Sequence, residues 1–190
     1  MSHLNKPVLV LNKVWMPVRV VKAIRAFKLL FANKASAVNT DTFYIYNWGE
    51  WLKQPFSDSD FTVSTVNFEI KVPEVIVLCK YDKVFKKHVK LTKRNIYIRD
   101  NYTCQYSGKK VNKGESDIDH VVPLSKGGKN SWENMVVCSK NINRKKANKS
   151  LKQSGLKLIK NPTIPDNTKL LIDPKMKIPE SWRKFIQHGK

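Results

Sequence analysis

The sequence predicts an α+β protein: a small N-terminal α+β segment, a second folded segment and an extended C-terminal tail. Three observations support this fold class. β-branched runs and one amphipathic helical pattern share residues 1–82. Two strand patterns, a Gly-Gly loop and a capped helical pattern follow each other within residues 116–148. Four prolines then lie within residues 161–179, where they favour extended backbone.

The N-terminal segment begins with a β-branched run, residues 7–21, that is interrupted at Asn12 and at Met16-Pro17. This pattern predicts two short strands around a turn. Residues 22–35 then contain an amphipathic helical pattern that ends near Asn33, because four apolar residues follow helical spacing. These are Ile24, Phe27, Leu30 and Phe31. Three further strands are expected at residues 35–38, 43–46 and 74–78, and residues 48–60 are expected to form a loop or a short helix.

A basic segment, residues 81–93, loses the apolar period, so we place a boundary here: residues 1–82, 83–160 and 161–190. Its basic side chains suit phosphate contacts, and a solvated charged face is the alternative. They are Lys83, Lys86, Lys87, His88, Lys90 and Lys93. Thr92 is expected to cap a short helix that runs to Asp100.

The second segment predicts a strand entering Asp119-His120, a return segment over residues 131–137 and a helix over residues 140–148 with Ser139 as its N-cap. A short helix after Ser150 is expected to stop at Gly155. Residues 161–179 are expected to be extended and to wrap the surface, followed by a final short helix over residues 180–187.

The chain is strongly basic. It has 36 Lys and Arg residues against 15 Asp and Glu, a formal net charge of +21, and residues 83–160 hold 20 of the basic residues and 5 of the acidic ones. Such an excess favours a polyanion as partner. It leaves DNA, RNA and an anionic membrane surface as alternatives. Three cysteines, no signal peptide and no apolar run near 18 residues indicate a cytoplasmic protein without a membrane span or structural disulfide.

The candidate catalytic and metal-binding residues all lie within residues 117–146, whose sequence is DIDHVVPLSKGGKNSWENMVVCSKNINRKK. Asp119-His120 with Pro123, a Gly-Gly turn, Asn134, and Asn143-x-x-Lys146 occur in this order. The stretch resembles the nuclease core of the HNH family, as an H-N-N variant, and the resemblance implies a ββα-metal fold. Residues 1–82 loosely resemble the α+β segment that precedes this core in many bacterial and phage HNH proteins.

Phosphodiester hydrolysis requires an activated water and positive charge near the phosphoryl oxygens. The resemblance implies that His120 is the general base, that Asp119 and Asn143 hold Mg²⁺ or Mn²⁺, and that Asn134 ties the loop that orients the histidine. A neutral imidazole and two hard oxygen donors suit these tasks. The substrate is expected to be DNA, on family likeness alone. Neighbouring side chains on a strand point to opposite faces, so Asp119 and His120 can share a site only where the strand ends or distorts.

Phosphate contacts are expected from the basic residues around this motif. RNA-guided CRISPR nucleases have a similar DxDHxxP opening and N-R-x-K helix start, and this likeness implies phosphate contacts by Arg144 and Lys146. Further contacts are expected from Lys140, Lys126, Lys93 and Lys90. Two alternatives remain: a nucleic-acid-binding module with this fold but without cleavage, and a basic protein associated with RNA or the ribosome.

The chain differs from many family members in the residues that would bind a structural zinc. Many relatives carry two Cys-x-x-Cys pairs around the motif. Here the first pair is reduced to Cys104 and Ser107, and the second falls at Ser139 and Ile142, with Cys138 one place early. We therefore expect no structural zinc. Tyr106 and Ile142 are expected to fill that space, with the two cysteines as small buried apolar residues.

Overall fold

The computed structural model describes residues 3–82 and 89–186, which belong to two units. The first unit comprises residues 1–85 and 176–190, and the second comprises residues 86–175. The predicted tail is thus divided: residues 161–175 belong to the second unit and residues 176–190 to the first. Of the predicted phosphate contacts, Lys83, Lys86, Lys87 and His88 lie outside the described residues.

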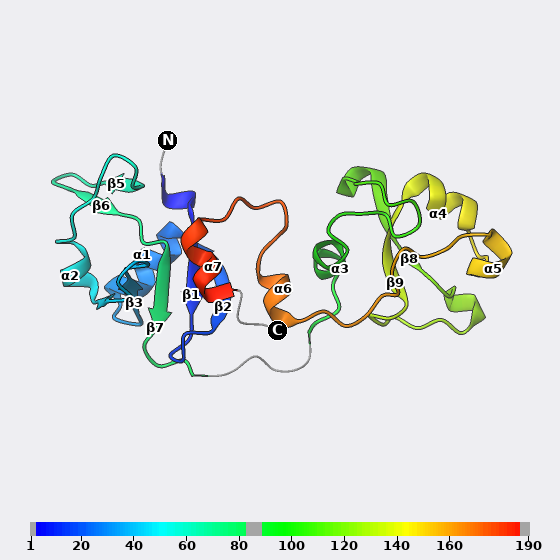
Figure 1. The fold of residues 1–190 in the computed structure, drawn as a ribbon, viewed down its shortest axis with the longest axis horizontal. Coiled ribbons are helices and arrows are strands. Elements are labelled where there is room, and N and C mark those ends of the chain that lie inside the picture. The colour runs from blue at the N-terminus through cyan, green and yellow to red at the C-terminus, as the bar shows by residue number, and fades with distance from the viewer. Residues whose placement is uncertain (1–2, 83–88, 187–190) are drawn as a thin grey trace. The chain divides into compact units, whose positions relative to one another are not determined.

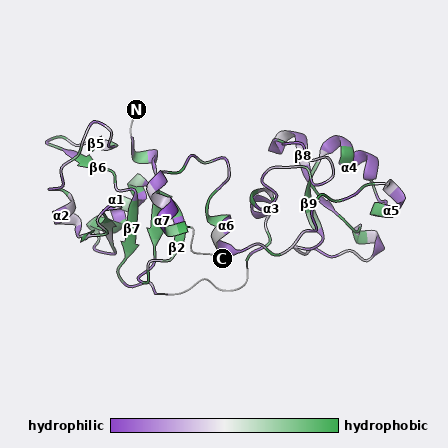
Figure 2. Ribbon diagram, viewed as in Figure 1, coloured by the Kyte–Doolittle hydropathy of each residue, from purple (hydrophilic) through white to green (hydrophobic). Residues whose placement is uncertain are grey.

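The first unit is built on a five-stranded sheet in the order β2-β1-β7-β3-β4 (Figure 1). Its strands are β1 (Pro7–Leu11), β2 (Pro17–Lys22), β3 (Ala35–Val38), β4 (Ile45–Tyr46) and β7 (Val75–Leu78). β1 and β7 are parallel, and the other neighbouring pairs are antiparallel. All four residues of β7 are buried, and the central strands are coloured hydrophobic in Figure 2. All five strands were predicted, and β4 is shorter than expected.

Helix α1 (Ala23–Phe31) packs on this sheet with a different face from the predicted one. Its fully buried residues are Ala23, Ala26 and Leu30, whereas Ile24 and Phe31 are 39% and 73% exposed. The prediction of the face was therefore wrong at these two residues. The buried residues keep the i, i+3, i+7 spacing, and two of them are alanines, whose small side chains allow a helix to approach a sheet closely.

The remaining elements of the first unit lie around this sheet. They are η1 (His3–Asn5), α2 (Trp48–Trp51), β5 (Thr62–Ser64), β6 (Glu69–Lys71), η4 (Glu180–Trp182) and α7 (Arg183–Ile186). The β5–β6 hairpin was not predicted, and its burial is low. Trp182 is fully buried, and its Nε1 donates a hydrogen bond to the Glu74 carbonyl at 3.0 Å. This bond anchors the end of the described chain in the first unit.

The second unit contains a ββα arrangement. β8 (Ser116–His120) and β9 (Met135–Ser139) form an antiparallel pair, and α4 (Lys140–Lys146) follows β9 directly. The hydroxyl of Ser139 accepts a hydrogen bond from the Ile142 amide, which confirms Ser139 as the N-cap. Helix α3 (Lys93–Arg99) is capped by Thr92, also as predicted. The shorter elements are η2 (Lys113–Glu115), η3 (Leu124–Lys126), α5 (Leu151–Ser154) and α6 (Asn167–Leu171).

The core of the second unit joins α3 to β9. Ile96 and Ile98 of α3 are buried in one cluster with Trp132, Val137 and Cys138. The predicted extended segment, residues 161–179, contains helix α6, whose Leu170 is buried in the same cluster; the expectation of a wholly extended tail was therefore wrong. In the part of the chain that the structure describes, no helix is long and apolar enough to cross a membrane.

Candidate active site

Three of the four predicted catalytic and metal-binding residues line one cavity in the second unit: His120, Asp119 and Asn143. Asn134 is not among the residues that line it. Asp119 and His120 come from the end of β8, Asn143 and Lys146 come from α4, and the open space between them is about 290 Å³. β8 ends at His120, and the Val121 amide still bonds to the Asn134 carbonyl before the chain turns at Pro123. Both neighbouring side chains can therefore line the same cavity.

Asp119 is 7% exposed, and both oxygens of its carboxylate have donors. The Tyr106 hydroxyl donates to Oδ2 at 2.6 Å. The Lys146 ammonium lies 3.0 Å from Oδ2 and 3.1 Å from Oδ1. Burial, and next the hydrogen bond to Asp119, raises the pKa of Tyr106 well above its ordinary value. The phenol therefore stays protonated and remains a donor to the carboxylate.

Lys146 does not have the exposed position that a phosphate contact requires. It is 1% exposed, and its ammonium also donates to the carbonyl of His120 at 2.7 Å. In this position the ammonium contacts protein oxygens, those of Asp119 and the His120 carbonyl, so the structure does not place Lys146 at the predicted phosphate contact. The physical reason is that the last turn of α4 faces β8, where the buried Asp119 supplies an opposite charge.

His120 is partly exposed, and its side chain contacts Asn130, a residue that the sequence did not predict for the site. Its Nε2 lies 2.7 Å from Oδ1 of Asn130, in the loop after the Gly-Gly turn. An amide oxygen can only accept, so Nε2 is the donor in this contact, and Nδ1 takes no part in it. The Gly-Gly-x-Asn spacing is the sequence signal that could have indicated Asn130.

Asn134 clamps the loop between β8 and β9. It is 8% exposed, its Oδ1 accepts from the Val122 amide at 2.8 Å, and its Nδ2 donates to the carbonyls of Val122 and Lys129. Gly128 is required beside it, because a Cβ there would lie 1.9 Å from the Val122 carbonyl oxygen. The geometry agrees with the loop-tying role that the resemblance implied for Asn134.

The clamp gives a direct stability prediction. Asn134→Ala is expected to lower the local unfolding free energy of the loop by about 2–4 kcal/mol, because three hydrogen bonds are lost and buried groups are left unpaired. The measurement is hydrogen exchange at the Val122 amide. Asn141→Ala, at an exposed position on α4, is the control and should change protection by less than about 0.5 kcal/mol. Equal protection in both variants would contradict the clamp.

Asn143 completes the candidate metal-binding set. Its side chain is partly exposed and makes no hydrogen bond within the described ranges, so its amide oxygen is open to a ligand. One carboxylate and one amide oxygen are hard donors that suit Mg²⁺ or Mn²⁺, with water and phosphate as the other ligands. In the described part of the chain, no group of three His, Cys, Asp or Glu side chains is placed to hold a metal. The donor types fit a divalent cation, although Lys146 already pairs with the carboxylate.

Comparison with known families shows which family the chain belongs to. A family model described as HNH endonuclease matches residues 104–150, which contain all the residues that line the cavity. A second model, described as HNH endonuclease-associated, N-terminal domain, matches residues 8–86. The chain belongs to the HNH endonuclease family. The resemblance read from residues 117–146 is thereby confirmed. No curated protein and no solved structure matches the chain.

In this HNH domain, the core contains the residues at the positions where many relatives carry zinc-binding cysteines. Cys104 and Cys138 are free thiols that are fully buried, and Tyr106 and Ile142 pack against the same cluster. Burial, together with the nearby Cys104 and Asp119, raises the pKa of Cys138 above its usual range. Tyr106 also has the polar role described above, which the prediction of apolar packing missed. The absence of a structural zinc stays a prediction.

Six predicted phosphate-binding residues lie in the described part of the second unit, and most of them are accessible. Lys90, Lys93, Lys126 and Arg144 are exposed, and Lys126 donates to the side chain of Gln153. Lys140 is partly exposed, and its ammonium donates to the Gly114 carbonyl at 2.6 Å. Four of the six predicted contacts therefore lie at the surface, one is partly covered and Lys146 is buried.

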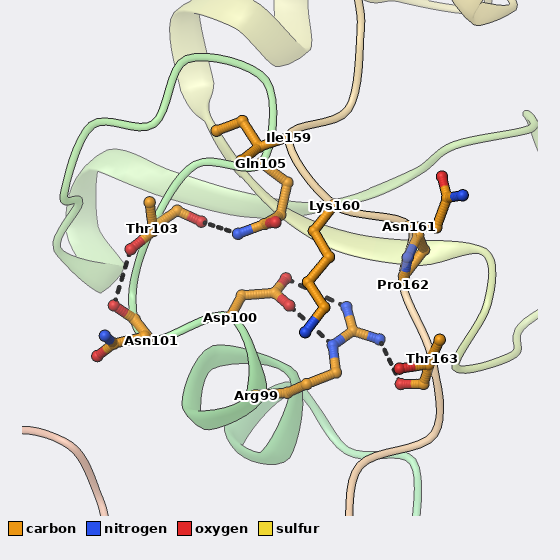
Figure 3. A pocket seen from close by; sticks show the side chains of 10 residues that line it. All are labelled: Arg99, Asp100, Asn101, Thr103, Gln105, Ile159, Lys160, Asn161, Pro162 and Thr163. Carbon is orange, nitrogen blue, oxygen red and sulfur yellow. Dashed lines mark hydrogen bonds and ion pairs between the residues drawn. The ribbon is translucent and has the colours of Figure 1, made fainter.

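Another cavity in the second unit, about 260 Å³, lies beside α3 (Figure 3). Arg99 and Asp100 form an ion pair at 2.7 Å in its wall. The Arg99 guanidinium also donates to the carbonyls of Trp132, Met135 and Thr163. Because these groups satisfy one another, we assign them a structural role, which is to hold the start of β9 and residues 159–163 beside α3.

Proposed function

We propose that this chain is a metal-dependent endonuclease that hydrolyses phosphodiester bonds in DNA, with His120 as the general base. The observation that carries the proposal is the convergence of His120, Asp119 and Asn143 on one open cavity from two separate elements. An imidazole beside two oxygen donors is the set that water activation and charge neutralisation at a phosphate require.

His120 would take a proton from the attacking water through Nδ1. Its hydrogen bond to Asn130 holds the ring by the other nitrogen. Asn134 fixes the backbone around Val122, two residues after the histidine, and so limits the movement of the strand end. Asn130 and Asn134 are positioning residues in this scheme, because they act through His120 and its loop.

Asp119 and Asn143 would hold the divalent cation at the same cavity. When bound, such a cation supplies positive charge for the phosphoryl oxygens and the leaving oxygen. Asn143 offers an open amide oxygen, and Asp119 offers a carboxylate buried at the cavity wall. Mg²⁺ or Mn²⁺ is the class of ion that these oxygen donors favour.

A basic groove of about 610 Å³ beside the first turns of α4 would hold the phosphate backbone. Lys109, Lys110, Lys140 and Arg144 line it, together with one acidic residue, Glu115. Lys109 and Arg144 are exposed, so their charges are available to phosphates. Lys109 was not among the residues that the sequence predicted for this role.

The groove predicts a salt-dependent binding defect. The double variant Lys109→Ala/Arg144→Ala is expected to bind duplex DNA more weakly and to lower the slope of log affinity against log salt by about 2, because about two phosphate contacts are lost. Titration of a labelled duplex at several salt concentrations measures both quantities. Glu115→Gln is the matched control, since it removes a negative charge from the same groove and should tighten binding. An unchanged slope in the double variant would contradict the groove.

The proposed function is tested by incubating the protein with supercoiled plasmid, linear duplex and single-stranded RNA, each with Mg²⁺, Mn²⁺ or EDTA. Cleavage of DNA that requires the divalent ion supports the proposal. Cleavage of RNA alone would overturn the substrate, and binding without cleavage would favour a nucleic-acid-binding module. One observation favours that second candidate: the charge of Asp119 is already paired with Lys146.

A further inference from the structure

Among the described residues of the second unit, Lys146 is the one Lys or Arg that is buried. It is 1% exposed, and its ammonium contacts three oxygens: both carboxylate oxygens of Asp119 and the carbonyl of His120. Lysine is rarely buried, because removing its charge from water is costly unless it is paired. The ammonium therefore occupies a site that is lined by oxygen atoms at the cavity wall.

These oxygen atoms are of the kind that a hard cation binds. Asp119 is the carboxylate of the proposed metal-binding pair, and Lys146 and Tyr106 already donate to it. A divalent cation cannot use the full charge of Asp119 while the ammonium is paired with it. Lys146 also lines the open cavity, and its flexible four-carbon stem gives the ammonium a path away from the carboxylate.

We propose that Lys146 and the divalent cation are alternative occupants of the Asp119 carboxylate. In the free protein the ammonium holds this place, and binding of the cation displaces it into the cavity lined by His120 and Asn143. There its charge faces the side from which a phosphate would enter. This inference rests on the proposed function only for the identity of the cation, and it assigns to Lys146 a role in controlling metal affinity.

The first test measures Mn²⁺ binding without nucleic acid, by titration followed with electron paramagnetic resonance. Lys146→Met keeps the apolar stem and removes the competing charge, so it should bind Mn²⁺ at least about tenfold more tightly than the wild type. Lys145→Met is the control, because it removes the same charge from the next, exposed position of α4. Its Mn²⁺ affinity should stay within about twofold of wild type, since surface charges are screened. Equal affinities in wild type and Lys146→Met, or no binding by either, would overturn the proposal.

The second test uses the unaltered protein, so it does not depend on whether Lys146→Met folds. Lysines are labelled by brief acetylation and quantified by mass spectrometry, with and without saturating Mn²⁺. Lys146 should be protected in the metal-free protein and become several-fold more reactive with Mn²⁺, while labelling of Lys145 stays constant. Unchanged protection of Lys146 with bound Mn²⁺ would overturn the proposal. Neither test uses cleavage, so failure of the proposed nuclease activity would be seen separately in the DNA assay.

Discussion

Replacing His120 with alanine is expected to lower the rate of DNA cleavage by about 10²–10⁴-fold, because the group that takes the proton from water is lost. DNA binding should be retained, since the side chain that is removed is not part of the basic groove. The measurement is single-turnover cleavage of plasmid with Mg²⁺, alongside a binding titration with EDTA.

The control for this experiment is His3→Ala, which changes a histidine in the first unit. This variant should cleave at the wild-type rate. Asn130→Ala adds a second comparison: if Asn130 positions the ring, the cleavage rate should fall while DNA affinity stays constant. Cleavage by His120→Ala at the wild-type rate would remove His120 from the proposed mechanism.

Replacing Asp119 with alanine is expected to destabilise the second unit by about 3–5 kcal/mol, because the ammonium of Lys146 would remain buried without its partner. The double variant Asp119→Ala/Lys146→Met should recover a large part of this loss, since the unpaired charge is also removed. Hydrogen exchange at the amides of β8 and β9 measures the local unfolding free energy.

This double-mutant cycle separates a buried ion pair from two independent contacts. A coupling energy of several kcal/mol would support the pair, whereas additive effects of the two substitutions would contradict it. Tyr106→Phe is a useful comparison, because it removes one hydrogen bond to the same carboxylate and leaves the pair in place. Its cost should be smaller, about 1–3 kcal/mol, since a hydrogen bond to a charged group is lost.

Local signals in the sequence determined much of the secondary structure. Thr92 and Ser139 cap the helices that they were predicted to cap, and Gly155 ends α5 with a φ of 67°. These predictions succeeded because a cap or a left-handed glycine depends on atoms within a few residues. The motif in residues 117–146 likewise indicated the family, because its residues follow one another within thirty positions of the sequence.

The tertiary structure alone decided which groups are partners and which faces are buried. Three features were not predictable from their neighbours in sequence: the buried face of α1, the burial of Leu170 in α6 and the position of Lys146. A long charged side chain can reach solvent or an opposite charge, and the choice depends on what lies across from it. For Lys146 that group is Asp119, 27 residues earlier in the chain, and its carboxylate offsets the cost of burying the ammonium.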